Sequence, residues 1–392
     1  MPPETAQKFE ALQAQAQRLM TVFARAGYEP VAPAVIQPAG LFLDVVGESL
    51  RARTYVFTDP DGEELCLRPD LTVPTCRLHL ARYPDGNVPA RYCYAGSAFR
   101  YQPAGADKAH PREFRQAGIE SFAVADREQD DAAVVATIAE ALRDAGLAQF
   151  TLRIGDLGLL NALLEALPMP ERWRRRLRHQ FWRREAFRDE LTRLTSRDEL
   201  AAHGLPAALV DKLDPDDPGN AADIVGDYLD QSGIELIGTR SLAEITERLL
   251  ADAADARETP LTQEDAGLIR NYVTVQGPAK AAARDIEYLM RRRKLDLAGG
   301  LDAFRRRLDL LGEAGIDLDA AEFDAEFGRN LEYYTGFVFE LIAPQLGPTS
   351  ALAGGGRYDS LLADVGAPMR VPAVGSCIHT ERLLAILEGG TP

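Results

Sequence analysis

The sequence predicts an α+β protein in which an all-helical insertion interrupts a core that contains a sheet. Three observations support this prediction. Strand-like segments flank turn signals early in the chain, at 54–68 and 91–123. Between about 158 and 300, helical and charge-rich segments follow one another with hardly any strand signal. Strand-like sequence then returns at 322–342 and 373–378.

The expected elements follow in chain order. In the first part of the core, 1–157, they are a helix at 4–26 ending at Gly27, an extended segment at 28–42, a hairpin at 54–68, strands at 91–100 and 114–123, a helix at 128–145 and a strand at 149–154. For the insertion, 158–315, we expect helices at 159–167, 171–194, 206–213, 221–231, 241–254 and 278–293. For the second part of the core, 316–392, we expect strands at 322–327, 337–342 and 373–378 and a helix at 381–387.

Composition limits the class of function. The chain has 392 residues, 46% apolar and 27% charged, which is typical of a globular protein, and its net charge of −16 disfavours general nucleic-acid binding. No signal peptide or membrane-spanning window is visible. The four cysteines form no CxxC pair and the five histidines form no cluster. We therefore expect reduced core thiols, no metal site and a cytoplasmic protein, rather than disulfides or metal ligands.

Polar and charged residues interrupt apolar, strand-like sequence in four places. Charges in such positions are costly unless they are paired or bind a ligand, so the pattern predicts a polar pocket built on a sheet. The segments are 67–72, 99–102 with 116–120, 329–336, and 354–359 with Gly375 and 381–382 downstream.

In this order, the segments resemble the class II aminoacyl-tRNA synthetase core in its histidyl-tRNA synthetase form. Pro33 stands where the first class II motif, a dimer element, has its proline, and Phe99-Arg100 resembles the start of the second motif. Residues 375–382 resemble the third motif, and 329–336 match a signature particular to the histidine enzymes. The resemblance covers about 5–155 and 315–390. It implies an antiparallel sheet flanked by helices, usually in a dimer.

The resemblance also implies a histidine-binding pocket without catalytic residues, cofactor or metal. Asp70, at the family's glutamate position, and Glu120 would accept hydrogen bonds from the ligand's ammonium or imidazole groups. Arg100 would pair with its carboxylate, and Arg329 stands where the family's arginine contacts the carboxylate or the activated carbonyl. The remaining implied ligand-facing residues are Thr72, Gln116, Tyr333, Tyr334 and Tyr358. The alternative is that these groups are inherited ion pairs around an empty site.

On the nucleotide side the sequence departs from the family pattern. Gln102 replaces the acid of the second motif, and His379 replaces a glycine that lies close to the adenine. An imidazole there would fill the adenine slot, because glycine is what permits close approach to the backbone. Arg382 is kept. We expect a degenerate nucleotide site.

The chain ends at Pro392, soon after the third motif, so we expect no anticodon-binding domain. A histidine-binding dimer that has lost its RNA partner resembles the regulatory subunits of short-form ATP phosphoribosyltransferase, the first enzyme of histidine biosynthesis. That resemblance implies a hetero-octamer with a catalytic subunit, L-histidine as allosteric effector, and no binding to nucleic acid or membrane.

Two enzymatic alternatives remain open. The chain could be a truncated histidyl-tRNA synthetase-like enzyme that activates histidine with ATP, which Arg100, Arg329 and Arg382 favour and Gln102 and His379 oppose. It could also be another synthetase paralogue that adenylates or ligates a small molecule. Both require a working ATP site.

Two further motifs have more than one interpretation. The triple glycine 354–356 lacks the lysine and spacing of a phosphate-binding loop, so we interpret it as a tight connection between strands. The arginine-rich stretch 172–184 is interpreted as a helix that docks an apolar side on its own domain, formed by Trp173, Leu177, Phe181 and Trp182. Contact with a partner subunit or with nucleic acid is the alternative.

Overall fold

The computed structural model describes residues 5–45, 47–102, 111–201, 209, 212–215, 217–232, 241–297, 299–328, 331–347 and 350–389. The chain forms two compact units. The first comprises Met1–Ala162 and Val273–Pro392, and the second comprises Leu163–Tyr272.

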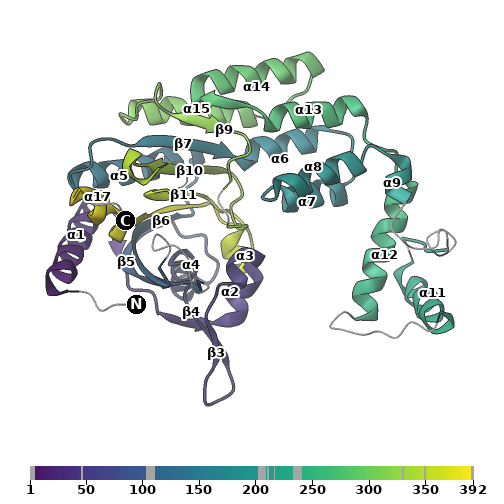
Figure 1. Ribbon diagram of the computed structural model, residues 1–392, viewed down its shortest axis with the longest axis horizontal. Coiled ribbons are helices and arrows are strands. Elements are labelled where there is room, and N and C mark those ends of the chain that lie inside the picture. Colours follow the sequence, from purple (N-terminus) through teal and green to yellow (C-terminus); the bar gives the residue numbers. More distant parts are fainter. Residues whose placement is uncertain are drawn as a thin grey trace. The chain divides into compact units, whose positions relative to one another are not determined.

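The first unit is built on a sheet in which nine strands of the described chain are paired, in the order β1-β5-β6-β12-β11-β10-β7-β9-β8 (Figure 1). The bounds are β1 (Glu29–Pro30), β5 (Ala90–Phe99), β6 (Glu113–Phe122), β7 (Thr151–Asp156), β8 (Gln276–Pro278), β9 (Glu322–Asp324), β10 (Phe337–Ile342), β11 (Ala353–Arg357) and β12 (Ala373–His379). The sheet is mixed, because β1 pairs with β5 and β7 with β9 in parallel, whereas the other pairs are antiparallel. The antiparallel centre of the sheet agrees with the expected fold.

Helices flank this sheet. The long helices α1 (Ala6–Arg25) and α5 (Arg127–Asp144) pack on each other, α15 (Gly300–Glu313) packs on α5, and α17 (Thr380–Leu387) packs on α1. Helix α5 also contacts β6, β10, β11 and β12, so it covers the middle of the sheet. Helix α14 (Ala279–Arg293) packs on α15 and β8.

A three-stranded sheet, β2-β4-β3, completes the first unit together with short helices. Its strands are β2 (Ile36–Pro38), β3 (Val56–Thr58) and β4 (Glu64–Leu67). The β3-β4 hairpin confirms the predicted turn, in which Asp59 Oδ1 accepts hydrogen bonds from the backbone N–H groups of Asp61 and Glu63. The helices are α2 (Ala39–Val45), α3 (Glu48–Arg51), α4 (Thr72–Arg82) and α16 (Leu361–Asp364), with a 3-10 turn at Pro344–Leu346.

The described part of the second unit is helical. Its helices are α7 (Glu171–Gln180), α8 (Arg184–Arg193), α9 (Arg197–Ala201), α11 (Pro218–Gln231) and α12 (Leu242–Arg257), with α6 (Leu157–Ala166) leading in and α13 (Gln263–Val273) leading out. Helix α12 begins with a reciprocal capping box between Ser241 and Glu244. The expected helix at 206–213 lies largely outside the described residues.

The arginine-rich stretch docks as predicted. Trp173 and Leu177 are fully buried in the second unit. The buried carboxylate of Asp255 accepts hydrogen bonds from Trp173 Nε1 and Arg172 Nε (2.7 Å), and it also pairs with Arg176. Since these arginines are engaged inside the unit, the contacts support the docking interpretation over nucleic acid.

Several expected elements differ from the observed ones. The single helix expected at 171–194 is broken at Phe181–Arg183 into α7 and α8. Residues 354–356 are not a connection but lie within strand β11, where an added Cβ on Gly355 would come within 2.0 Å of the Gly375 carbonyl oxygen. The second unit, Leu163–Tyr272, spans fewer residues than the expected insertion at 158–315, because β8, α14 and α15 belong to the first unit.

No described helix is both long and apolar enough to cross a membrane. Among the described residues, no group of three or more His, Cys, Asp or Glu side chains could hold a metal ion.

Candidate functional site

The candidate site is centred on Glu120, a fully buried carboxylate on β6. Three hydroxyl groups donate hydrogen bonds to it. Thr72, at the start of α4, and Tyr94, on β5, both donate to Oε1 at 2.8 Å, and Tyr358, which follows β11, donates to Oε2. The Glu120 carboxylate thus connects its own strand, β6, to three other segments: the start of α4, β5 and the residue after β11.

Gly375 on β12 makes room for this carboxylate. Register pairs Gly375 directly opposite Glu120, so both residues face the same side of the sheet. A Cβ at position 375 would lie 1.6 Å from Glu120 Oε2. The glycine that the third motif supplies is therefore required by the path of the Glu120 side chain.

Burial raises the pKa of Glu120 to about 7, although the three hydroxyl donors act in the opposite direction. Removal from water disfavours the charged carboxylate, and the nearby charge of Asp70 adds to this effect. Glu120 therefore changes its protonation state close to neutral pH.

Asp70 is the second buried carboxylate of the site, with 4% of its surface exposed. Its Oδ1 accepts a hydrogen bond from the Val73 N–H in the first turn of α4, at 3.2 Å. Its Oδ2 has no hydrogen-bond partner among the residues that the structure describes. Burial raises the pKa of Asp70, and the charge of Arg100 partly counteracts this. A buried oxygen of this kind favours the binding of a hydrogen-bond donor, because leaving a buried acceptor unpaired costs about 1–3 kcal/mol.

Arg100 is held at the end of β5. Its Nε donates to the Pro69 carbonyl oxygen at 2.9 Å, and its guanidinium lies over the Phe114 ring, 5.1 Å from the centroid. Because Pro69 directly precedes Asp70 in the chain, this bond holds the arginine close enough for its charge to oppose the rise that burial causes in the pKa of Asp70. In the described part of the site, the Arg100 cation thus lies near the buried carboxylate of Asp70.

Three buried tyrosines form an aromatic group beside the carboxylates. The ring centroids of Tyr333 and Tyr334 are 4.8 Å apart, and those of Tyr333 and Tyr358 are 5.7 Å apart. Burial, followed by the charges of its neighbours Tyr334, Asp70 and Glu120, raises the pKa of Tyr333 well above its usual value. Burial likewise raises the pKa of Tyr358 well above its usual value, so the hydroxyls of Tyr333 and Tyr358 stay protonated and can donate hydrogen bonds.

Gln116 and His379 face each other across β6 and β12. Gln116 Nε2 donates to Cys377 Sγ at 3.2 Å, and the His379 ring lies 5.8 Å from that of Phe114. Because Arg100 lies over the same Phe114 ring, His379 and Arg100 are both next to this aromatic side chain.

The other predicted nucleotide-side residues make local contacts. The Gln102 carbonyl oxygen accepts two hydrogen bonds from Arg112, at 2.9 and 3.1 Å. Arg382 Nη1 donates to the Ala351 carbonyl oxygen at 2.5 Å. Glu381 accepts from the Arg115 N–H with both carboxylate oxygens, which fastens α17 to β6.

The structure brings most of the predicted histidine-site residues together on one side of the sheet. They are Asp70, Thr72, Arg100, Gln116, Glu120, Tyr333, Tyr334 and Tyr358. Arg329 lies outside the described residues. One expectation was wrong in its local structure, because 67–72 is not a strand throughout: β4 ends at Leu67 and α4 begins at Thr72.

Sequence reasoning missed Tyr94, which hydrogen-bonds Glu120. The signal was present in the strand pair, because the register of β5 and β6 puts Tyr94 opposite Gly118, on the face that also holds Glu120. An added Cβ at Gly118 would come within 2.7 Å of the Tyr94 hydroxyl oxygen. A tyrosine paired with a glycine, on the strand face that also carries a buried acid two residues on, predicts a hydrogen bond from the tyrosine to the acid.

Comparison with known proteins identifies the family to which this fold belongs. The family model described as histidyl-tRNA synthetase matches residues 1–215 and 250–383. A crystal structure of an ATP phosphoribosyltransferase regulatory subunit/histidyl-tRNA synthetase from Bacillus halodurans is similar with a TM-score of 0.69 at 21% identity, covering 99% of this chain and 82% of that one. A histidine–tRNA ligase subunit from Alicyclobacillus acidocaldarius has a TM-score of 0.58 at 26% identity, covering 99% and 96%. The fold and site thus define a class II protein of the histidyl-tRNA synthetase type.

Two curated relatives narrow the assignment. The ATP phosphoribosyltransferase regulatory subunit of Agrobacterium fabrum is 35% identical over 95% of this chain and 97% of its own length. The protein of the same name from Mesorhizobium japonicum is 36% identical, over 97% and 98%. The chain belongs to the family of ATP phosphoribosyltransferase regulatory subunits.

Proposed function

We propose that this chain is the non-catalytic regulatory subunit of a cytoplasmic ATP phosphoribosyltransferase and senses histidine at the site around Asp70 and Glu120. Family membership supports the regulatory role, and chemistry on the nucleotide and the phosphoribosyl donor belongs to the partner subunit. This makes the chain part of the first step of histidine biosynthesis and of its feedback control.

The observation that best supports a ligand here is the buried Oδ2 of Asp70, which lacks a partner in the described part of the chain. An ammonium group would supply both the missing donor and a compensating charge. Charge-assisted contacts of this kind are each worth about 1.5–3 kcal/mol.

The two carboxylates have different roles in this proposal. Glu120 already accepts three hydrogen bonds from the protein, so it organises the hydroxyls of Thr72, Tyr94 and Tyr358 around the ligand. Asp70 anchors the ammonium. Arg100 and Arg329 pair with the ligand carboxylate, and Tyr333, Tyr334, Tyr358 and Gln116 surround the imidazole.

Regulation follows by linkage. If histidine binds more tightly to one arrangement of the assembly than to another, it shifts the population toward that arrangement and changes catalysis in the partner. We propose a hetero-octamer with the catalytic subunit, built on dimers of this chain. The degenerate nucleotide positions, Gln102 and His379, favour this role over histidine activation.

Two assays of the purified chain test the proposal. Added to a short-form catalytic subunit, it should raise phosphoribosyl-ATP synthesis and make that synthesis sensitive to histidine. Absence of both effects would refute the regulatory assignment. Strong ATP–pyrophosphate exchange with histidine and the chain alone would instead support the enzymatic alternative.

A further inference from the structure

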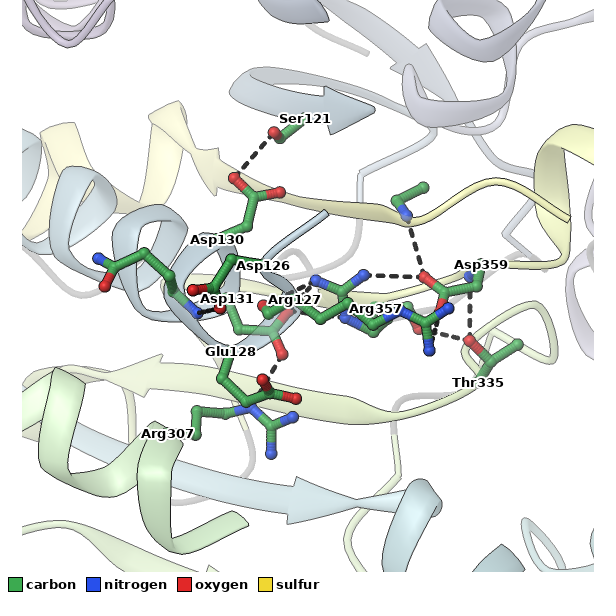
Figure 2. A network of polar contacts seen from close by, with 12 residues as sticks. Ser121, Asp126, Arg127, Glu128, Asp130, Asp131, Arg307, Thr335, Arg357 and Asp359 are labelled. Carbon is green, nitrogen blue, oxygen red and sulfur yellow. Dashed lines mark hydrogen bonds and ion pairs between the residues drawn. The ribbon is translucent and has the colours of Figure 1, made fainter. Parts of the chain in front are cut away.

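A buried ionic network includes Arg357 and Asp359, which flank Tyr358 in the chain, and no role in ligand contact accounts for it (Figure 2). Arg357, at the end of β11, donates from Nε to Asp131 Oδ1 and from Nη1 to Asp359 Oδ1, both at 2.9 Å. Asp131, on α5, also accepts from Arg307 Nε at 2.8 Å. Arg307 in turn donates to Asp156 Oδ2 at 2.8 Å, at the end of β7. The network therefore joins β7, β11, α5 and α15.

The network reaches the site through the backbone on either side of Tyr358. Arg357 precedes this tyrosine and Asp359 follows it, and Asp359 Oδ1 also accepts from the Ala373 N–H at 2.9 Å. The Tyr358 N–H donates to the Ala373 carbonyl oxygen at 2.8 Å. Both neighbours of Tyr358 are thus fixed by the network, while its hydroxyl points to Glu120.

Thr335 connects the segment that holds Tyr333 and Tyr334 to the backbone of Arg357 and Asp359. Its N–H donates to the Arg357 carbonyl oxygen at 2.8 Å, and its Oγ1 accepts from the Asp359 N–H at 3.0 Å. Thr335 directly follows Tyr333 and Tyr334. One threonine therefore fastens the two segments that hold all three tyrosines to each other.

Stability alone does not explain this arrangement. Buried ion pairs recover little more than their desolvation cost, and apolar side chains of similar volume often stabilise a core equally well. What a satisfied network provides is one defined geometry. Here that geometry is the relative position of Tyr333, Tyr334 and Tyr358.

We propose that Thr335, Arg357 and Asp359 are positioning residues, which act through the three tyrosines to set the shape of the ligand site without touching the ligand. This inference rests on the proposed histidine site for its ligand, but the geometry of the tyrosines can be tested without any ligand.

The test uses Thr335→Val in the full chain, with Thr335→Ser as the conservative variant. Thr246→Val is the control, because Thr246 is also a buried or half-buried threonine with a bonded hydroxyl, but it donates only to the Leu242 carbonyl oxygen within α12 of the second unit. Hydrogen exchange of the segment 331–336 is measured without ligand, and histidine affinity is measured by calorimetry. We expect at least tenfold faster exchange and about tenfold weaker histidine binding in Thr335→Val, and values near wild type in the other two.

Unchanged exchange in Thr335→Val would overturn the inference, whether or not histidine binds. Faster exchange with an unchanged histidine affinity would also overturn it, because the tyrosines would then move without consequence for the ligand. A wild-type chain that binds no histidine would refute the proposed site instead, and the exchange result would still decide whether Thr335 holds the tyrosines.

Discussion

Asp70 and Glu120 are both buried carboxylates, yet their surroundings give them different chemistry. Glu120 accepts three hydroxyl groups, whereas Asp70 accepts one backbone N–H and keeps Oδ2 without a partner in the described chain. A carboxylate that is already satisfied gains little from a ligand. One with an unpaired oxygen gains a full hydrogen bond and charge compensation.

Asp70→Asn tests this difference at the level of one atom. The amide can keep the hydrogen bond from Val73 N–H through its oxygen but loses the charge and the second acceptor. We expect histidine affinity, measured by calorimetry, to fall by about 2 kcal/mol or more. Asp217→Asn is the control, because Asp217 likewise accepts a hydrogen bond from the backbone N–H three residues on, that of Asn220, but lies outside the site. Equal affinities in both variants would mean that histidine binds elsewhere.

The raised pKa of Glu120 makes a prediction about pH. The pKa of Glu120 is about 7 in the folded chain, whereas the ordinary value is 4.5. Between these pH values the folded chain therefore keeps a proton that the unfolded chain has lost. The stabilisation by this proton is complete below pH 4.5 and is lost as pH rises through about 7. Its size is on the order of 3 kcal/mol.

Glu120→Gln removes this titration. Between pH 5 and 8, the free energy of unfolding from urea titrations should therefore fall less in the variant than in the wild type. Parallel pH profiles of the two proteins would show that Glu120 does not carry the proton.

At the level of elements, the pairing of β6 with β12 depends on a glycine, Gly375, opposite Glu120. In Gly375→Ala, the new Cβ would collide with Glu120 and with the Ile119 carbonyl oxygen, 2.8 Å away. We expect a loss of about 2–3 kcal/mol in the free energy of unfolding. Gly267→Ala is the matched control, because a Cβ on this helical glycine of α13 meets nothing within 4 Å. It should stabilise the chain by about 0.5–1 kcal/mol. Similar losses in both would argue against the collision.

The strands around this contact could be predicted from sequence, but some elements could not. Alternation and turn residues located β5, β6 and the β3-β4 hairpin, because these depend on near neighbours. Helix α4 escaped prediction, since its first turn contains Thr72, Val73, Pro74 and Thr75, which are typical of strands or turns. The strand at 353–357 was hidden by its glycines, which are present because neighbouring strands approach closely.

The candidate site was predictable in its residue types but not in its connections. Resemblance supplied eight residues that lie together, whereas the hydrogen bonds among them depend on register and on helix starts. The open oxygen of Asp70 and the bond from Tyr358 to Glu120 follow from packing between segments that are distant in the sequence. Local sequence patterns carry no information about such distances.

At the level of the whole molecule, one surface is unusually apolar for a chain of net charge −16. Register places Ile36, Phe57, Leu65 and Leu67 on one face of the β2-β4-β3 sheet, and Ile36 is 51% and Phe57 38% exposed. The other face holds Gln37 and Cys66, which are buried. Exposed apolar faces of this kind are typical of subunit interfaces. Pro33, which resembles the proline of the first class II motif, precedes β2 in the chain, so this face is the candidate surface for the proposed dimer.

Phe57→Ser should therefore weaken the proposed self-association at least tenfold, measured by sedimentation velocity over a range of concentrations, since it removes an exposed apolar side chain from this face. Val56→Ser is the matched control, because Val56 is 43% exposed on the same strand but pairs with Cys66 and so faces the opposite way. If both variants dissociate alike, loss of strand propensity rather than the apolar face is responsible. If Phe57→Ser leaves self-association unchanged, the proposed dimer is built on another surface, and the apolar face is then available to the catalytic subunit.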